Sequence, residues 1–208
     1  MVKTKWNGEF FTNANPELTA RNMGLTTSDA VAELVDNSID AGATKISVQA
    51  YRNNDDKPAL LIQDNGPGFP NNGVDGQTGE EVDDGLRYCL AHGGAISSND
   101  IEGTLIGRFH AGLTLGVSCQ SPKTEVFTRS DEDGDNFRFN KIDFADLKNN
   151  NNKLPNTTFK DPNIHGSIAN LLKWSDGTGT IINLCELDNP DRKSVRRKGG
   201  LNDYLKNE

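Results

Sequence analysis

Hydrophobic spacing in the first third of the chain predicts one amphipathic helix followed by two strands. Apolar side chains recur at helical spacing over residues 30–35 and form a single stripe. Apolar and polar side chains then alternate over residues 45–51, as they do in a half-buried strand. The apolar run 59–62 predicts a second strand that ends at Asp64, and the turn at 53–56 implies antiparallel pairing.

The rest of the chain predicts another helix and three more strands. A glycine-punctuated stretch at 106–117 leads into a helix. Residues 124–129 and 137–142 have the pattern of strands, joined by the turn 131–135. Residues 179–187 predict the strand that closes the sheet.

Three shorter segments complete the pattern. Thr27 or Ser28, followed by Asp29, is expected to cap the first helix and make its first turn acidic. A short helix is expected near 85–92. The four consecutive asparagines within 148–153 predict a low-complexity surface loop.

The first helix carries a polar trio beside its apolar stripe. Glu33, Asn37 and Asp40 follow one another at spacings of four and three, which places them within roughly 60° of each other on a helix. A carboxylate of this kind can serve as a general base, and an amide oxygen can bind a hard cation. A solvated helix face is the other interpretation.

The second strand leads into the run D-N-G-P-G-F. A turn alone accounts for these residue types. Equally, Gly66 and Gly68 let the backbone approach a flat ligand closely, while Asp64 can accept a hydrogen bond from an exocyclic amine.

Glycine also marks two later segments. Backbone amides within 106–117 can bind an anion near a helix start, although small residues can instead serve close helix packing. The run G-T-G-T at 177–180 opens a strand. The motif G-x-x-x-x-G-K-[ST] is absent from the sequence, which excludes a P-loop site.

In this order, the four segments resemble the ATP-binding domain shared by gyrase, the ninety-kilodalton heat-shock chaperones, histidine kinases and MutL (GHKL). The matching patterns are E-x-x-x-N, D-x-G-x-G, an altered G-x-x-G-x-G, and G-T before the last strand. The wording at 33–44 is most similar to the MutL, type II topoisomerase and microrchidia branches. The resemblance implies an ATP-binding domain at 25–187 with a lid at about 70–104, an arm at 1–24, and a basic tail or the start of a missing downstream region at 188–208.

The family fold is an α/β sandwich with a mixed, mainly antiparallel sheet covered on one face by helices. By resemblance, Glu33 would activate water, Asn37 would bind Mg²⁺, and Asp64 would accept the adenine amine. The other nucleotide contacts implied are Gly66 and Gly68 at the base, Gly107, His110, Ala111 and Gly112 at the phosphates, and Thr178 beside Asp64. His110 stands where the family usually has glycine, so it either contacts the triphosphate or only packs in the lid.

The composition is that of a globular domain, and the net charge limits the class of binding partner. The chain has 208 residues, enough for one core. Its net charge of −8 argues against a broadly basic nucleic-acid surface, although 192–198 is rich in Lys and Arg. Cys89, Cys119 and Cys185 suggest neither a disulfide framework nor a zinc site. With no signal or membrane-spanning stretch, the expected location is intracellular, in the cytoplasm or in the nucleus of a eukaryote.

Mg²⁺-dependent ATP binding and hydrolysis is the function that these features predict. The nucleotide state would control lid closure and homodimer formation, and DNA is a candidate partner because several relatives act on it. Two alternatives stay open: an ATP-gated interaction module with negligible turnover, and a phosphotransferase of the histidine-kinase type.

Overall fold

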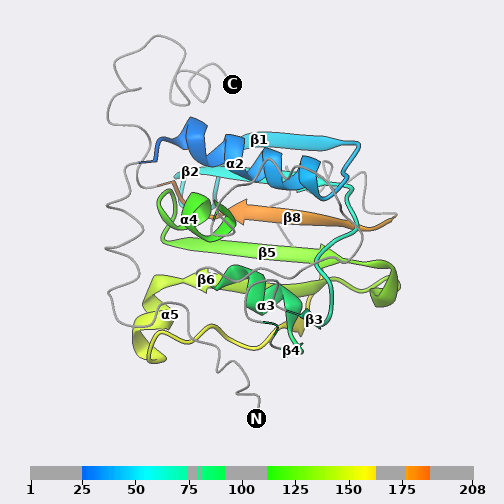
Figure 1. The fold of residues 1–208 in the computed structure, drawn as a ribbon. Helices are drawn as coiled ribbons and strands as arrows, with labels where there is room; N and C mark the ends of the chain where they lie inside the picture. Colours follow the sequence, from blue (N-terminus) through cyan, green and yellow to red (C-terminus); the bar gives the residue numbers. More distant parts are fainter. Residues whose placement is uncertain (1–24, 75–78, 80, 92–111, 163–176, 188–208) are drawn as a thin grey trace.

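The computed structural model describes residues 25–74, 79, 81–91, 112–162 and 177–187 (Figure 1). These residues form an α/β sandwich in which helices cover one face of a six-stranded sheet. Every described pairing in the sheet is antiparallel. The sandwich fold predicted from the sequence is therefore confirmed, with antiparallel pairing throughout its described strands.

The sheet has the strand order β1-β2-β8-β5-β6-β7. Its strands are β1 (Ile46–Arg52), β2 (Pro58–Asp64), β8 (Gly179–Leu184), β5 (Lys123–Arg129), β6 (Arg138–Asp143) and β7 (Thr158–Phe159). A separate hairpin pairs β3 (Gly73–Val74) with β4 (Glu81–Val82). Strand β8 is the last described strand in sequence, yet it lies between β2 and β5, so it fills the middle of the sheet instead of closing an edge.

The described helices are α2 (Thr27–Asp40), α3 (Gly85–Leu90), α4 (Gly112–Ser118), α5 (Phe144–Asn149) and the short 3-10 helix η1 (Asp131–Asp133). Three of them match predicted helices, whereas α5 was not predicted and covers the first two residues of the asparagine loop expected at 148–153. Helix α5 begins there because the Asp143 carboxylate accepts hydrogen bonds from the backbone amides of Ala145 and Asp146, at 3.1 and 3.3 Å. Asn151 and Asn152, with φ of 49° and 57°, form the turn after it.

Thr26 caps helix α2, so the predicted cap at Thr27 or Ser28 is wrong by one or two residues. The Asp29 amide donates to the Thr26 hydroxyl oxygen at 3.1 Å. In return, the Thr26 amide donates to the Asp29 carboxylate at 3.0 Å. This reciprocal pair needs the acidic residue three positions after the cap, a spacing that only Thr26 provides.

The larger of two described hydrophobic clusters lies between the helices and the sheet, and α2 supplies much of its cover. Ala30, Leu34 and Ser38 form the buried stripe of α2. Leu34 belongs to a cluster with Ile62 of β2 and Leu184 of β8. Helices α2 and α4 lie side by side over this face (Figure 1). Among the described helices, none is long and apolar enough to cross a membrane.

Candidate functional site

Asp64 lies at the end of β2, where two elements converge on its carboxylate. In the register of the sheet it faces Thr180 of β8. Its Oδ2 accepts a hydrogen bond from the Ser38 hydroxyl of α2 at 3.0 Å, and its Oδ1 accepts one from the Gly66 amide at 2.8 Å. The residue is only 9% exposed. A buried acidic group is therefore held in one orientation at the edge of the helix layer.

Burial raises the pKa of the Asp64 carboxyl, while hydrogen bonds from the Gly66 amide, the Ser38 hydroxyl and the Thr180 backbone act in the opposite direction; burial prevails. An ionised carboxylate has about four acceptor positions. The Ser38 hydroxyl and the Gly66 amide occupy two of these positions. Asp64 therefore keeps acceptor capacity for an amine that enters the site.

Gly179 allows β8 to approach the backbone of Asp64. A Cβ at this position would lie 2.3 Å from the Asp64 carbonyl oxygen. Because only glycine fits, the residue before Thr180 is fixed by packing.

Asn65, the first residue of the loop that follows Asp64, accepts hydrogen bonds from the amides of Thr44 and Lys45 at 2.9 and 2.7 Å. Asn65 thereby ties the loop to the turn after α2.

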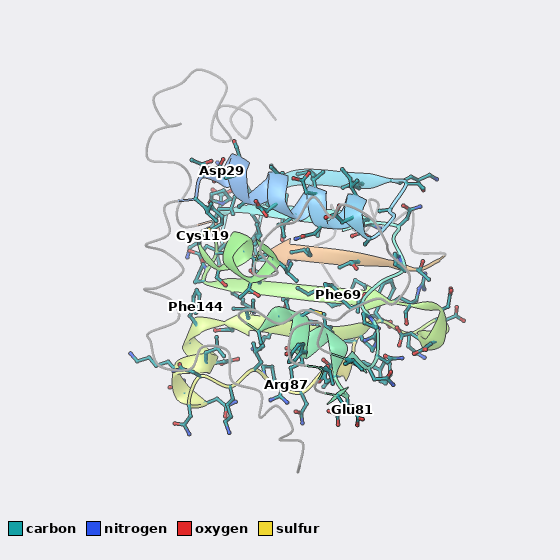
Figure 2. All side chains as sticks on the ribbon, viewed as in Figure 1. Asp29, Phe69, Glu81, Arg87, Cys119 and Phe144 are labelled. Atoms are coloured by element: carbon teal, nitrogen blue, oxygen red, sulfur yellow. The ribbon has the colours of Figure 1, made fainter. Side chains whose placement is uncertain are left out.

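Gly68 has a structural reason to be glycine. Its φ is +74°, and a Cβ there would lie 2.4 Å from the Arg129 carbonyl oxygen of β5. The next amide, that of Phe69, donates to the Thr128 hydroxyl oxygen at 2.8 Å. Phe69 is labelled close to β5 in Figure 2. Packing against β5 therefore accounts for Gly68, and a contact with a nucleotide base stays a prediction.

Glu33 and Asn37 are separated by one turn of α2, and both are half-buried. At about 100° per residue they lie some 40° apart around the helix. Asn37 directly precedes Ser38, the residue whose hydroxyl contacts Asp64. Helix α2 therefore carries the predicted base, the predicted Mg²⁺ ligand and the serine that bonds the Asp64 carboxylate.

Thr180 occupies the position beside Asp64 that the sequence assigns to Thr178. Thr180 is buried within β8, and its hydroxyl lies 3.4 Å from that of Thr128. Thr178 is half-buried and precedes the strand. The run G-T-G-T offers two equivalent threonines, and only the strand register separates them. Ser38 is the other site residue that the sequence analysis did not identify. The feature that could have indicated it is its position four residues after Leu34, which places a polar side chain in the buried stripe of α2.

The predicted phosphate contacts are described only in part. Gly107, His110 and Ala111 lie outside the described residues, and Gly112 is the first residue of α4. Gly116 of α4 faces α2, where a Cβ would meet the Ala30 carbonyl oxygen at 3.6 Å. Small residues therefore do serve close helix packing in α4, as the alternative interpretation held, and the anion role of the preceding stretch stays a prediction.

No group of three or more His, Cys, Asp or Glu side chains suited to a metal ion occurs among the described residues. Mg²⁺ in nucleotide sites is commonly held by one or two protein ligands together with phosphates and water. Asn37 offers such a ligand through its amide oxygen.

Comparison with known proteins adds a family match. The model of the histidine kinase-, DNA gyrase B- and HSP90-like ATPases matches residues 25–178. The solved topoisomerase IV ATP-binding domain of Francisella tularensis, in complex with a small-molecule inhibitor, is similar at 15% identity with a TM-score of 0.48. That similarity covers 85% of this chain and 42% of the other, so this chain spans less than half of that protein. No curated protein matches the sequence.

Proposed function

Because the chain belongs to the family of histidine kinase-, DNA gyrase B- and HSP90-like ATPases, we propose that it binds ATP with Mg²⁺ and hydrolyses it to ADP and phosphate. The observation that carries this proposal is the buried Asp64 carboxylate, which the Ser38 hydroxyl and the Gly66 amide orient and which keeps acceptor capacity for a ligand. An adenine amine is a donor suited to that position.

Each of three residues has one role in this proposal. Asp64 accepts the adenine amine and so selects the base. Asn37 holds Mg²⁺ through its amide oxygen, and the ion supplies charge neutralisation at the phosphates. Glu33, one turn earlier on α2, accepts a proton from the attacking water. A rigid helix that carries both Asn37 and Glu33 keeps their separation constant during the reaction.

The remaining contacts are assigned by the motifs. Gly66 and Gly68 border the base, and Thr178 supports the hydrogen bonds at Asp64 together with Thr180. Amides at Gly107, Ala111 and Gly112 bind the phosphates, where His110 adds a polar contact.

We also propose that nucleotide binding closes a lid within residues 70–104 and promotes homodimer formation. Helix α3 lies inside this range, yet Leu86 and Leu90 are fully buried. The Arg87 guanidinium donates to the Leu154 carbonyl oxygen through Nε at 3.1 Å and through Nη2 at 2.7 Å. These contacts support a fixed α3, so we propose that the part of the lid that moves lies outside α3. DNA is the proposed type of downstream partner.

An ATP-gated module with negligible turnover is the second candidate. It is favoured by His110, which replaces a glycine of the phosphate motif and restricts the backbone there. Under this proposal ATP binds as a structural switch, and Glu33 serves no catalytic step.

A phosphate-release assay with Mg²⁺ and radiolabelled ATP separates these functions. Free phosphate released in proportion to protein concentration, with no label on the protein, is the result expected of an ATPase. Binding without release would establish the gated module. Label retained on the protein would instead establish a phosphotransferase of the histidine-kinase type.

A further inference from the structure

The loop that follows Asp64 is held at its far end by a buried ion pair. The side chains of Arg138 in β6 and Asp133 in η1 are only 6% and 2% exposed, and Arg138 Nε lies 2.9 Å from Asp133 Oδ1. Arg138 Nη1 donates to the Pro70 carbonyl oxygen at 3.1 Å, and Nη2 donates to the Phe69 carbonyl oxygen. One guanidinium therefore joins the η1 turn to the loop.

Both partners of this pair are fixed by their surroundings. The Asp133 carboxylate also accepts hydrogen bonds from the Ser130 amide and hydroxyl, at 2.8 and 2.9 Å. The guanidinium of Arg138 is a planar fork of five donors, and each of its three nitrogens already has an acceptor. Because the Arg138 side chain is only 6% exposed and each of its nitrogens has a protein acceptor, we assign it to holding the loop.

The loop is short enough to transmit the position of Phe69 to Asp64. Between Phe69 and Gly66 lie only Pro67, whose φ is restricted by its ring, and Gly68, which is packed against β5. The Gly66 amide in turn donates to Asp64 Oδ1. A shift at Phe69 therefore reaches a donor that orients the Asp64 carboxylate.

We propose that Arg138, held by Asp133, is a positioning residue that sets the geometry of the base loop and thereby the affinity and selectivity for adenine. This inference rests on the proposed ATP site. Adenine presents an amine donor to Asp64, whereas guanine presents a carbonyl oxygen, which a carboxylate repels. Selectivity thus depends on an Asp64 carboxylate that cannot turn away, and a loosened loop costs ATP more affinity than GTP.

The test measures ATP and GTP binding to the Arg138→Met protein by calorimetry, well below its melting temperature. We expect ATP affinity to fall about tenfold, which is about the contribution of one hydrogen bond. The ratio of ATP affinity to GTP affinity should fall as well. Hydrogen exchange should accelerate at the Phe69 amide. Arg138→Lys should give an intermediate ratio, because one ammonium cannot reproduce the fork.

Leu147→Ala is the matched control for simple loss of stability. Leu147 of α5 is 2% exposed and belongs to the main core cluster, so its truncation lowers the melting temperature. It should nevertheless leave the ATP to GTP ratio and the Phe69 exchange unchanged. A purely structural role for Arg138 predicts the same behaviour for both variants.

If Arg138→Met does not fold, Asp133→Asn serves in its place, because it removes the charge and keeps an acceptor oxygen. An unchanged nucleotide ratio and unchanged Phe69 exchange in the folded variant would overturn the inference. Wild-type protein that binds no ATP would overturn the proposed function, and the selectivity part of this inference with it. Accelerated Phe69 exchange in that case would still show that Arg138 clamps the loop.

Discussion

At the scale of single residues, the site depends on how Asp64 is surrounded. Its burial alone would favour the neutral acid, and the hydrogen bonds that it accepts counteract this without reversing it. The pKa of the Asp64 carboxyl is therefore raised above its usual value, while the Ser38 hydroxyl and the Gly66 amide fix its orientation. Two measurable consequences follow, one for pH dependence and one for the division of roles between Asp64 and Glu33.

Adenosine affinity should fall on acidification, starting above pH 3.8, the usual pKa of an aspartic acid side chain. The ionised Asp64 accepts the amine, so binding is complete above its raised pKa and is lost as the pH falls through that value. Adenosine is the ligand of choice because it has no phosphates that titrate. Fluorescence titration over a pH series, with circular dichroism to confirm folding, provides the measurement. Constant affinity down to pH 3.8 would contradict the assigned role.

Glu33→Ala should abolish phosphate release while ATP affinity stays near that of the wild type. A general base acts on water and touches the bound nucleotide little, and its loss typically lowers the rate by about 10²- to 10⁴-fold. Glu186→Ala, which removes a surface carboxylate paired with Lys57, is the control with expected normal turnover. Steady-state phosphate release and calorimetry give the two quantities. Equal loss of affinity and rate would mean that Glu33 binds nucleotide.

At the scale of elements, sequence patterns predicted most helices and strands to within a few residues. The apolar run located β2 because nearly all of its side chains are buried, and alternation located β1 although Val48 is exposed and only Tyr51 is buried. These patterns missed α5, whose six residues are too few to show a helical period. The sequence analysis named Thr178 and did not identify Thr180, which pairs with Asp64, because strand register decides which residue lies opposite Asp64 and register is a property of the paired strands.

The close approach of β8 to β2 predicts that alanine substitution destabilises the protein at Gly179 and leaves its stability unchanged at Gly177. Gly179→Ala should destabilise the protein by roughly 1–3 kcal/mol, because its Cβ would collide with the Asp64 carbonyl oxygen. Gly177→Ala is the matched control, since a Cβ there meets nothing within 4 Å. Urea unfolding followed by circular dichroism measures both. Equal midpoints for the two variants would show that β8 and β2 are not packed this closely.

At the scale of the whole molecule, the described chain combines a continuous antiparallel sheet with a helix layer on the face that carries the site. The order of motifs predicted this architecture through the family resemblance: the first motif lies on helix α2, the second follows β2, and the last opens β8. The position of β8 in the middle of the sheet brings the last motif beside the second one. Segments far apart in the sequence thus build one site.

Nucleotide binding should change the association state. With Mg²⁺ and a non-hydrolysable ATP analogue, light scattering should report a dimer of the 22.7 kDa chain, and with ADP a monomer. The physical reason is that a closed lid presents a new surface to a second copy. Hydrogen exchange at β3 and β4 should slow in parallel, while α3 should not change. A monomer under both conditions would confine this chain to nucleotide binding without self-association.

The most direct test of the central claim is calorimetric titration of the Asp64→Asn protein with Mg²⁺ and ATP. The amide replaces part of the acceptor capacity with donors and opposes the adenine amine in a buried site, a loss of roughly 1–3 kcal/mol, or about 10- to 100-fold in affinity. Asp55→Asn, an exposed change in the turn between β1 and β2, should bind ATP like the wild type. ATP affinity in Asp64→Asn equal to that of the wild type would contradict the assignment of Asp64 as the adenine-binding residue.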